Sequence, residues 1–117
     1  MTAQFSKFGR ASGLVAGCAL LFGGALTAAA EDLSQLAAGQ RLLEENCARC
    51  HAVTRTGDSP HPEAPPFRTL SERYPVEQIE EALVEGLSTG HPDMPQFIFT
   101  PAKAAAIVAY LKSIQAE

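Results

Sequence analysis

The segment Cys47-Ala48-Arg49-Cys50-His51 constrains this chain more than any other stretch of its sequence. Two thiols three residues apart, followed at once by an imidazole, form the C-x-x-C-H pattern of c-type haem attachment. In one helical turn, Cys47, Cys50 and His51 stand at positions i, i+3 and i+4, which share a face. Both sulfurs can then bond the haem vinyl groups while the imidazole meets the iron. The segment predicts one covalent haem c, with Cys47 and Cys50 as thioethers and His51 as an iron ligand.

Other uses of paired cysteines fit the sequence less well. A structural zinc site needs four ligands at typical spacings, and His61 and His91 do not supply a second pair of that kind. A thioredoxin-like motif needs a βαβ context, and no strand pattern is longer than residues 97–99. A disulfide between two such close cysteines would be a poor staple, because it closes a loop of only a few residues.

The first thirty residues have the layout of a secretory signal peptide. A basic start with Lys7 and Arg10 precedes twenty residues without charge, and Ala28-Ala29-Ala30 offers a small-residue cleavage site. We therefore expect residues 1–30 to be removed. Residues 31–117 would then form one monohaem domain in the periplasm of a Gram-negative bacterium.

Two alternatives for this N-terminal segment stay open. Its uncharged run is long enough to be retained as a membrane anchor, although it is rich in Ala and Gly. Val15-Ala16-Gly17-Cys18 also resembles a lipoprotein processing box, in which Cys18 would be lipidated. The apolar run continues past Cys18, which favours the ordinary signal peptide and no stable membrane insertion after cleavage.

The charge of the mature chain limits its partners. Residues 31–117 carry seven Lys and Arg against thirteen Asp and Glu, a side-chain charge of −6. A negative surface argues against nucleic acid and against anionic membranes as partners. A domain this small buries a limited core and usually needs a staple. A covalently held macrocycle would supply one.

Hydrophobic periodicity predicts three helices in the mature chain. The first covers residues 33–46 and runs directly into the Cys47–His51 turn, with Gly39 in its middle at a cost of about 1 kcal/mol. The second begins near Pro75 and ends between residues 86 and 90, and its exposed face is acidic. Thr100 and Pro101 begin the last helix. The Pro-rich stretch between the first two helices predicts a stiff loop, anchored in the core by Phe67 and Leu70.

The mature chain resembles the class I (His/Met) monohaem c-type cytochromes over nearly its whole length. The resemblance is carried by the following stretches: Gly39-x-x-x-Leu43-x-x-x-Cys47-x-x-Cys50-His51, Pro65-Pro66-Phe67, Met94-Pro95 and Ile107-Val108-Ala109-Tyr110-Leu111-Lys112. It implies an all-α cytochrome c fold of three to four short helices around one haem. It also implies that the N- and C-terminal helices cross, with Gly39 packed against Ile107 and Tyr110. There is no Trp, although many members have one near a haem propionate.

The remaining site residues follow from this resemblance and from the chemistry of the side chains. Met94 is the expected sixth ligand, since it is the only Met of the mature chain and cytochromes c pair Met with His. His91 is the runner-up and His61 is third. The resemblance suggests a carbonyl of the Pro65/Pro66 segment, assigned to Pro66, for the second ring nitrogen of His51. Donors to the propionates are expected from the residues Arg68 and Tyr74, with Arg73 and Arg55 as further candidates.

An iron with two strong protein ligands has no open position for a substrate. The sequence therefore predicts a one-electron carrier rather than an enzyme, monomeric when free, with redox partner proteins such as a dehydrogenase, an oxidase or another cytochrome. Two alternatives stay open. One is the haem subunit of a periplasmic dehydrogenase, and the other is a gas or redox sensor with a labile sixth ligand.

Overall fold

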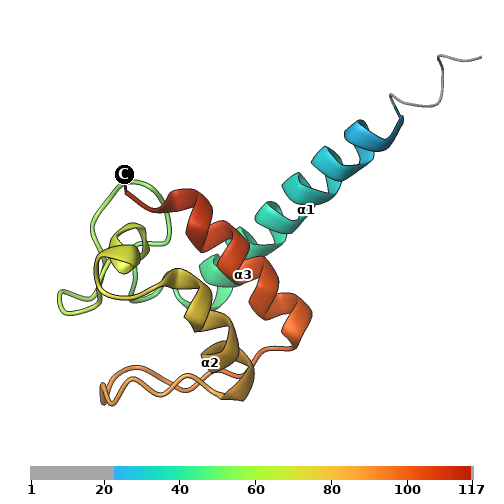
Figure 1. Ribbon diagram of the computed structural model, residues 1–117. Coiled ribbons are helices and arrows are strands. Elements are labelled where there is room, and N and C mark those ends of the chain that lie inside the picture. The colour runs from blue at the N-terminus through green and yellow to red at the C-terminus, as the bar shows by residue number, and fades with distance from the viewer. Residues whose placement is uncertain (1–22, 117) are drawn as a thin grey trace, which may run out of the picture.

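The computed structural model describes residues 23–116, and it has helices but no strand in that part of the chain. Leu87 and Phe97 form one isolated antiparallel bridge. Figure 1 shows the helices, whose bounds are: α1, Gly23–Asn46; the 3₁₀ helices η1, Phe67–Glu72, and η2, Val76–Gln78; α2, Ile79–Glu85; and α3, Pro101–Ile114. The prediction of an all-α fold is confirmed. Residues 1–22, with Cys18 and most of the predicted signal peptide, lie outside the described residues.

Helix α1 begins ten residues earlier than the sequence pattern predicts. The helix runs without interruption past Ala30, the residue after which we expect cleavage. The cleavage itself stays a prediction. Its N-terminal part projects away from the other helices (Figure 1), and Leu33 is accordingly 68% exposed. Among the described residues, no helix is both long enough and apolar enough to span a membrane.

Helices α1 and α3 cross at Gly39. A Cβ atom on Gly39 would lie 2.0 Å from the Ala106 carbonyl oxygen and 2.8 Å from Cβ of Tyr110. The predicted crossing of the two helices is therefore confirmed, and so is the predicted packing of Gly39 against Tyr110. The backbone nearest to Gly39 is that of Ala106, which was not predicted, and Ile107 is a core residue that is 1% exposed.

The start of α3 follows the predicted pattern. Thr100 stands at the N-cap position, but its side chain makes no capping hydrogen bond. Pro101 opens the helix, where a missing N–H leaves no bond unmade. Successive turns then bury one stripe of the helix: Ala104, Ile107, Val108, Leu111 and Ile114. This stripe is the centre of the hydrophobic core, which α1, η1 and α2 complete.

The Pro-rich stretch predicted as a loop ends in the helix η1, which buries Phe67 and Leu70 as expected. Gln115 fastens η1 to the end of α3. Its Nε2 donates to the Phe67 carbonyl at 2.9 Å, and its Oε1 accepts from the Ser71 N–H at 2.9 Å. Nothing in the sequence pattern of Gln115 predicts this link.

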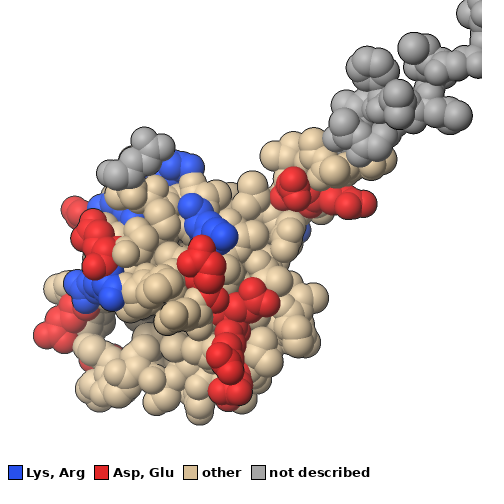
Figure 2. Space-filling model, viewed as in Figure 1, with Lys and Arg blue, Asp and Glu red and all other residues tan. Residues whose placement is uncertain are grey.

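The second predicted helix is shorter than expected. Pro75 is extended and precedes η2, and α2 stops at Gly86, whose φ of +108° favours glycine. Acidic side chains gather over α2 (Figure 2), and all of them are exposed: Glu77, Glu80, Glu81 and Glu85. Glu77 pairs with Lys112 of α3 at 3.1 Å.

Tyr110 joins α3 to the segment after the C-x-x-C-H motif. Its hydroxyl donates to the Val53 carbonyl at 3.1 Å, and the residue is 8% exposed. Burial, and to a lesser extent the charge of Glu44, raise the pKa of Tyr110 above its ordinary value of 10.0, while Arg55 acts in the opposite direction. The neutral phenol is therefore the form that the fold stabilises.

We expect Tyr110 to titrate above pH 10.0 in the folded protein. Because its pKa is higher in the folded than in the unfolded chain, its contribution to stability is complete below pH 10 and is lost as the pH rises further. ¹³C-tyrosine NMR across this pH range measures the titration, and the Tyr110→Phe spectrum identifies the resonance. A midpoint at or below 10.0 would contradict the effect of burial.

Candidate haem site

One large cavity, about 740 Å³ in volume, opens between the C-x-x-C-H turn, η1, α2 and the loop after α2. Its lining is mainly apolar and includes core residues such as Leu43, Phe67 and Leu111. The cavity brings together five residues predicted for the site: Cys47, Cys50, His51, Tyr74 and Met94. Its size is that of a site for a large organic ligand. The lining and the donor set thus fit a covalently attached haem.

The end of α1 forms the attachment turn. Hydrogen bonds continue past Asn46, from the Cys47 N–H to the Leu43 carbonyl at 2.8 Å and from the His51 N–H to the Cys47 carbonyl at 2.9 Å. The motif thus continues α1 as a hydrogen-bonded turn, with one helix-type bond from His51 to Cys47, and is not itself regular helix. Both thiols and the imidazole line the same cavity.

The two motif cysteines, Cys47 and Cys50, are each half-buried, and no disulfide joins them. Burial, and to a lesser extent the neighbouring Cys50, raise the pKa of Cys47 to about 11. This pKa belongs to the thiol before haem attachment, because a thioether sulfur carries no proton. Among the described residues, no group of three or more His, Cys, Asp or Glu is arranged to hold a metal ion.

The imidazole of His51 is fixed on two sides. Its Nδ1 lies 2.9 Å from the carbonyl oxygen of Pro65, and its ring stacks on Phe67 with centroids 4.5 Å apart. A proton on Nδ1 that is donated to this carbonyl leaves Nε2 free to bind a metal. The acceptor is Pro65 and not the predicted Pro66, because the Pro66 carbonyl accepts from the Thr69 hydroxyl at 3.0 Å.

Phe67 is the site residue whose role the sequence did not reveal. Its N–H donates to the Ala52 carbonyl at 2.9 Å, and its carbonyl accepts from Gln115. The sequence marked Phe67 only as a core anchor. The structure adds that its buried ring lies against His51.

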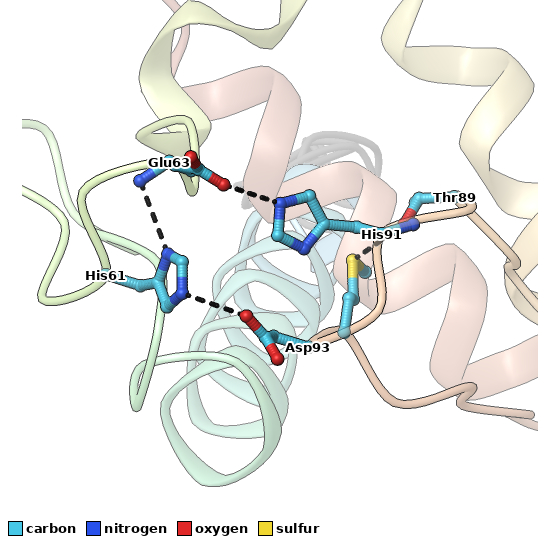
Figure 3. A network of polar contacts seen from close by, with 6 residues as sticks. His61, Glu63, Thr89, His91 and Asp93 are labelled. Atoms are coloured by element: carbon cyan, nitrogen blue, oxygen red, sulfur yellow. Dashed lines mark hydrogen bonds and ion pairs between the residues drawn. The ribbon is translucent and has the colours of Figure 1, made fainter.

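Two loops supply the candidates for the second iron ligand: the loop after α2 holds His91 and Met94, and the Pro-rich loop before η1 holds His61. Met94, His91 and His61 all line the cavity, and each is half-buried. Each imidazole faces a carboxylate: His91 lies 3.1 Å from Glu63, and His61 lies 3.6 Å from Asp93 (Figure 3). The Met94 sulfur has only a weak contact, from the Thr89 hydroxyl at 3.5 Å.

Of the predicted propionate donors, the structure places two at the cavity and two away from it. Tyr74 lines the cavity and is 44% exposed, and Arg73 also lines it. Arg68 does not, because its guanidinium donates to the Gly57 carbonyl at 2.6 Å. Arg55 donates to the Ser113 carbonyl at the end of α3. Arg73 and Tyr74 are therefore better placed than Arg68 to meet an acidic group at the cavity.

Comparison with known proteins gives the same assignment as the cavity. The family model described as cytochrome c matches residues 36–115, which include the whole C-x-x-C-H motif and all three histidines. No curated protein and no solved structure matches the chain. Because the match covers most of the sequence, the chain belongs to the cytochrome c family, whose members carry covalent haem c and transfer electrons to and from partner proteins.

Proposed function

We propose that this protein is a periplasmic one-electron carrier whose haem iron is bound by His51 and Met94. When bound, haem c supplies a reversible Fe(III)/Fe(II) couple. The observation that carries the proposal is that His51 and Met94 come from distant parts of the chain and line one cavity. Two strong ligands would close the iron to substrates and leave electron transfer as its reaction.

The surroundings of His51 support its role as a permanent ligand. The Pro65 carbonyl accepts the proton of Nδ1 and sets the tautomer, and the Phe67 ring limits rotation of the imidazole. A ligand held in this way changes little between oxidation states. Electron exchange then requires little rearrangement of the protein.

The surroundings of Met94 support it over the two histidines. Both imidazoles already face carboxylates, whereas the thioether accepts only one weak contact. A thioether ligand raises the haem potential relative to a second imidazole. Apolar residues of the cavity exclude water from the haem, which also raises the reduction potential.

The partners are redox proteins that meet the open side of the cavity. Weak redox encounters bury little surface area, which suits a free carrier. The periplasmic location is proposed from the sequence, namely the basic start, the uncharged run and the Ala28-Ala29-Ala30 cleavage site. N-terminal sequencing of the exported protein tests the cleavage, which is expected to leave Glu31 first.

Replacement of Met94 tests the ligand assignment. We expect oxidised wild-type protein to have the weak far-red absorption band of Met–Fe(III) ligation, and Met94→Ala to lose it. We also expect the reduction potential to fall, by on the order of 100 mV, because axial ligands shift haem potentials over a wide range. His91→Ala and His61→Ala are the matched controls and should keep the band.

The Met94 and His91 variants, together with carbon monoxide binding and purification from the native source, distinguish the alternative functions. If His91→Ala rather than Met94→Ala removes the sixth ligand, the centre is a bis-imidazole one of lower potential. If the wild-type ferrous protein binds carbon monoxide rapidly and Met94→Ala changes little, the protein is a sensor. Purification together with a native dehydrogenase would instead indicate a subunit of an enzyme complex.

A further inference from the structure

Two tripeptides of the same pattern face each other beside the cavity. His61-Pro62-Glu63 belongs to the Pro-rich loop, and His91-Pro92-Asp93 directly precedes Met94. Figure 3 shows their side chains pointing toward one another from two separate loops. Their imidazole rings meet edge to face, with centroids 5.9 Å apart.

The contacts between the two tripeptides are crossed. Nε2 of His91 lies 3.1 Å from Oε2 of Glu63, and Nε2 of His61 lies 3.6 Å from Oδ2 of Asp93. The imidazole of each tripeptide thus contacts the carboxylate of the other tripeptide. We call these four side chains, His61, Glu63, His91 and Asp93, the clasp.

Local contacts orient the clasp. The Glu63 N–H donates to Nδ1 of His61 at 3.3 Å, which leaves the proton of a neutral ring on Nε2, the atom facing Asp93. Pro62 and Pro92 fix one backbone angle each and reduce the freedom of the two tripeptides. Formation of the two pairs therefore costs less backbone entropy than a surface contact between loops without proline would.

Backbone hydrogen bonds connect the clasp to both sides of the cavity. The His61 N–H donates to the Cys50 carbonyl at 3.1 Å, within the attachment turn. The Met94 N–H donates to the His91 carbonyl at 3.2 Å. The clasp thus links the residue that holds the haem covalently to the loop that presents Met94.

We propose that the clasp holds the Met94 loop closed over the cavity and thereby controls how readily small neutral ligands such as imidazole displace Met94. The inference rests on the proposed function, in which Met94 is an iron ligand. All four residues of the clasp are positioning residues in this account, because they act on the ligand through the loop.

The expected effect is moderate because all four side chains reach solvent. The carboxylates are about 70% exposed, with values of 69% for Asp93 and 74% for Glu63. Pairs of this kind change an equilibrium by a few-fold at most. Loss of one pair should raise the population of the open loop about threefold, and loss of both about tenfold.

Stopped-flow binding of imidazole to the oxidised holoprotein measures the opening. We expect Glu63→Ala and His91→Ala each to raise the binding rate about threefold, and Glu63→Ala/His61→Ala to raise it about tenfold by breaking both pairs. Glu81→Gln is the matched control, because it removes an exposed carboxylate of α2 that lies outside the clasp, and it should leave the rate unchanged.

Coupling between partners distinguishes the clasp from general destabilisation. The double variant Glu63→Ala/His91→Ala should bind imidazole no faster than the faster single variant, because both remove the same contact. The exchange Glu63→His with His91→Glu restores the pair and should recover most of the wild-type rate. Unchanged rates, or fully additive single effects, would overturn the clasp even if the melting temperature falls.

Failure of the clasp and failure of the ligand assignment give different results. If Met94 is not the ligand, oxidised wild-type protein lacks the far-red band and Met94→Ala binds imidazole at the wild-type rate. If only the clasp is wrong, the band is present and Met94→Ala binds imidazole much faster than wild type. In that case the clasp variants retain the wild-type rate.

Discussion

Replacement of Gly39 by alanine should lower the free energy of unfolding by about 3 kcal/mol. Alanine favours the helix by about 1 kcal/mol at an ordinary interior position. At Gly39, however, the new Cβ would lie 2.0 Å from the Ala106 carbonyl oxygen and 2.7 Å from its carbon. A backbone carbonyl in a helix cannot rotate away, so α1 and α3 must move apart. The steric cost therefore exceeds the gain in helix propensity.

Denaturant unfolding of the holoprotein, followed by far-UV circular dichroism, measures this change. Ala37→Val is the matched control, since it enlarges an exposed residue of the same helix and should cost less than about 1 kcal/mol. An equal or higher stability of Gly39→Ala would mean that the helices do not cross at this distance. It would also remove the reason for a glycine in the middle of α1.

The sequence predicted the parts of this structure that depend on local spacing. The C-x-x-C-H motif is only five residues long, so a single hydrogen-bonded turn brings both thiols and His51 to one cavity. The start of α3 at Pro101 follows from the preference of Pro for the first helical position, and the buried stripe of α3 follows from periodicity. Gly39 indicated a close approach, because a glycine inside a helix is unfavourable unless something needs the space.

The errors occur where a position depends on a loop or on a rotation about a helix axis. The backbone nearest to Gly39 belongs to Ala106, the residue before the predicted Ile107, and helical periodicity does not resolve a rotation of α3 by one residue. Pro65 and Pro66 could each offer a carbonyl to His51. Which of them does so depends on the first turn of η1, where the Thr69 hydroxyl donates a hydrogen bond to the Pro66 carbonyl.

The remaining contacts could not be predicted because they join segments far apart in the chain. Two His-Pro-acid tripeptides are visible in the sequence, but nothing in either shows that they meet. Gln115 is an ordinary residue at the end of a helix, and its bond to Phe67 depends on where η1 lies. Such contacts depend on the packing of the whole domain around its cavity.

Loss of the haem should unfold this domain. A cavity of about 740 Å³ lies among core residues that include Leu43, Phe67 and Ile107. Without haem, the mainly apolar lining of this open cavity lies in contact with water, which is unfavourable. Small domains are stable by only about 5–15 kcal/mol. We therefore expect the double variant Cys47→Ala/Cys50→Ala to lose the covalent haem and most of its helical circular dichroism signal.

The single variants and a control define the cause of this loss. Cys47→Ala and Cys50→Ala each leave one thioether and should keep the haem after acid–acetone extraction, with a lower melting temperature. Arg41→Ala changes an exposed residue of α1 that does not line the cavity, and it should retain haem and stability. A double variant without haem that still unfolds cooperatively would mean that the lining closes on itself. The domain would then owe its stability to the crossing of α1 and α3 and to the bonds of Gln115 and Tyr110, rather than to the group in its centre.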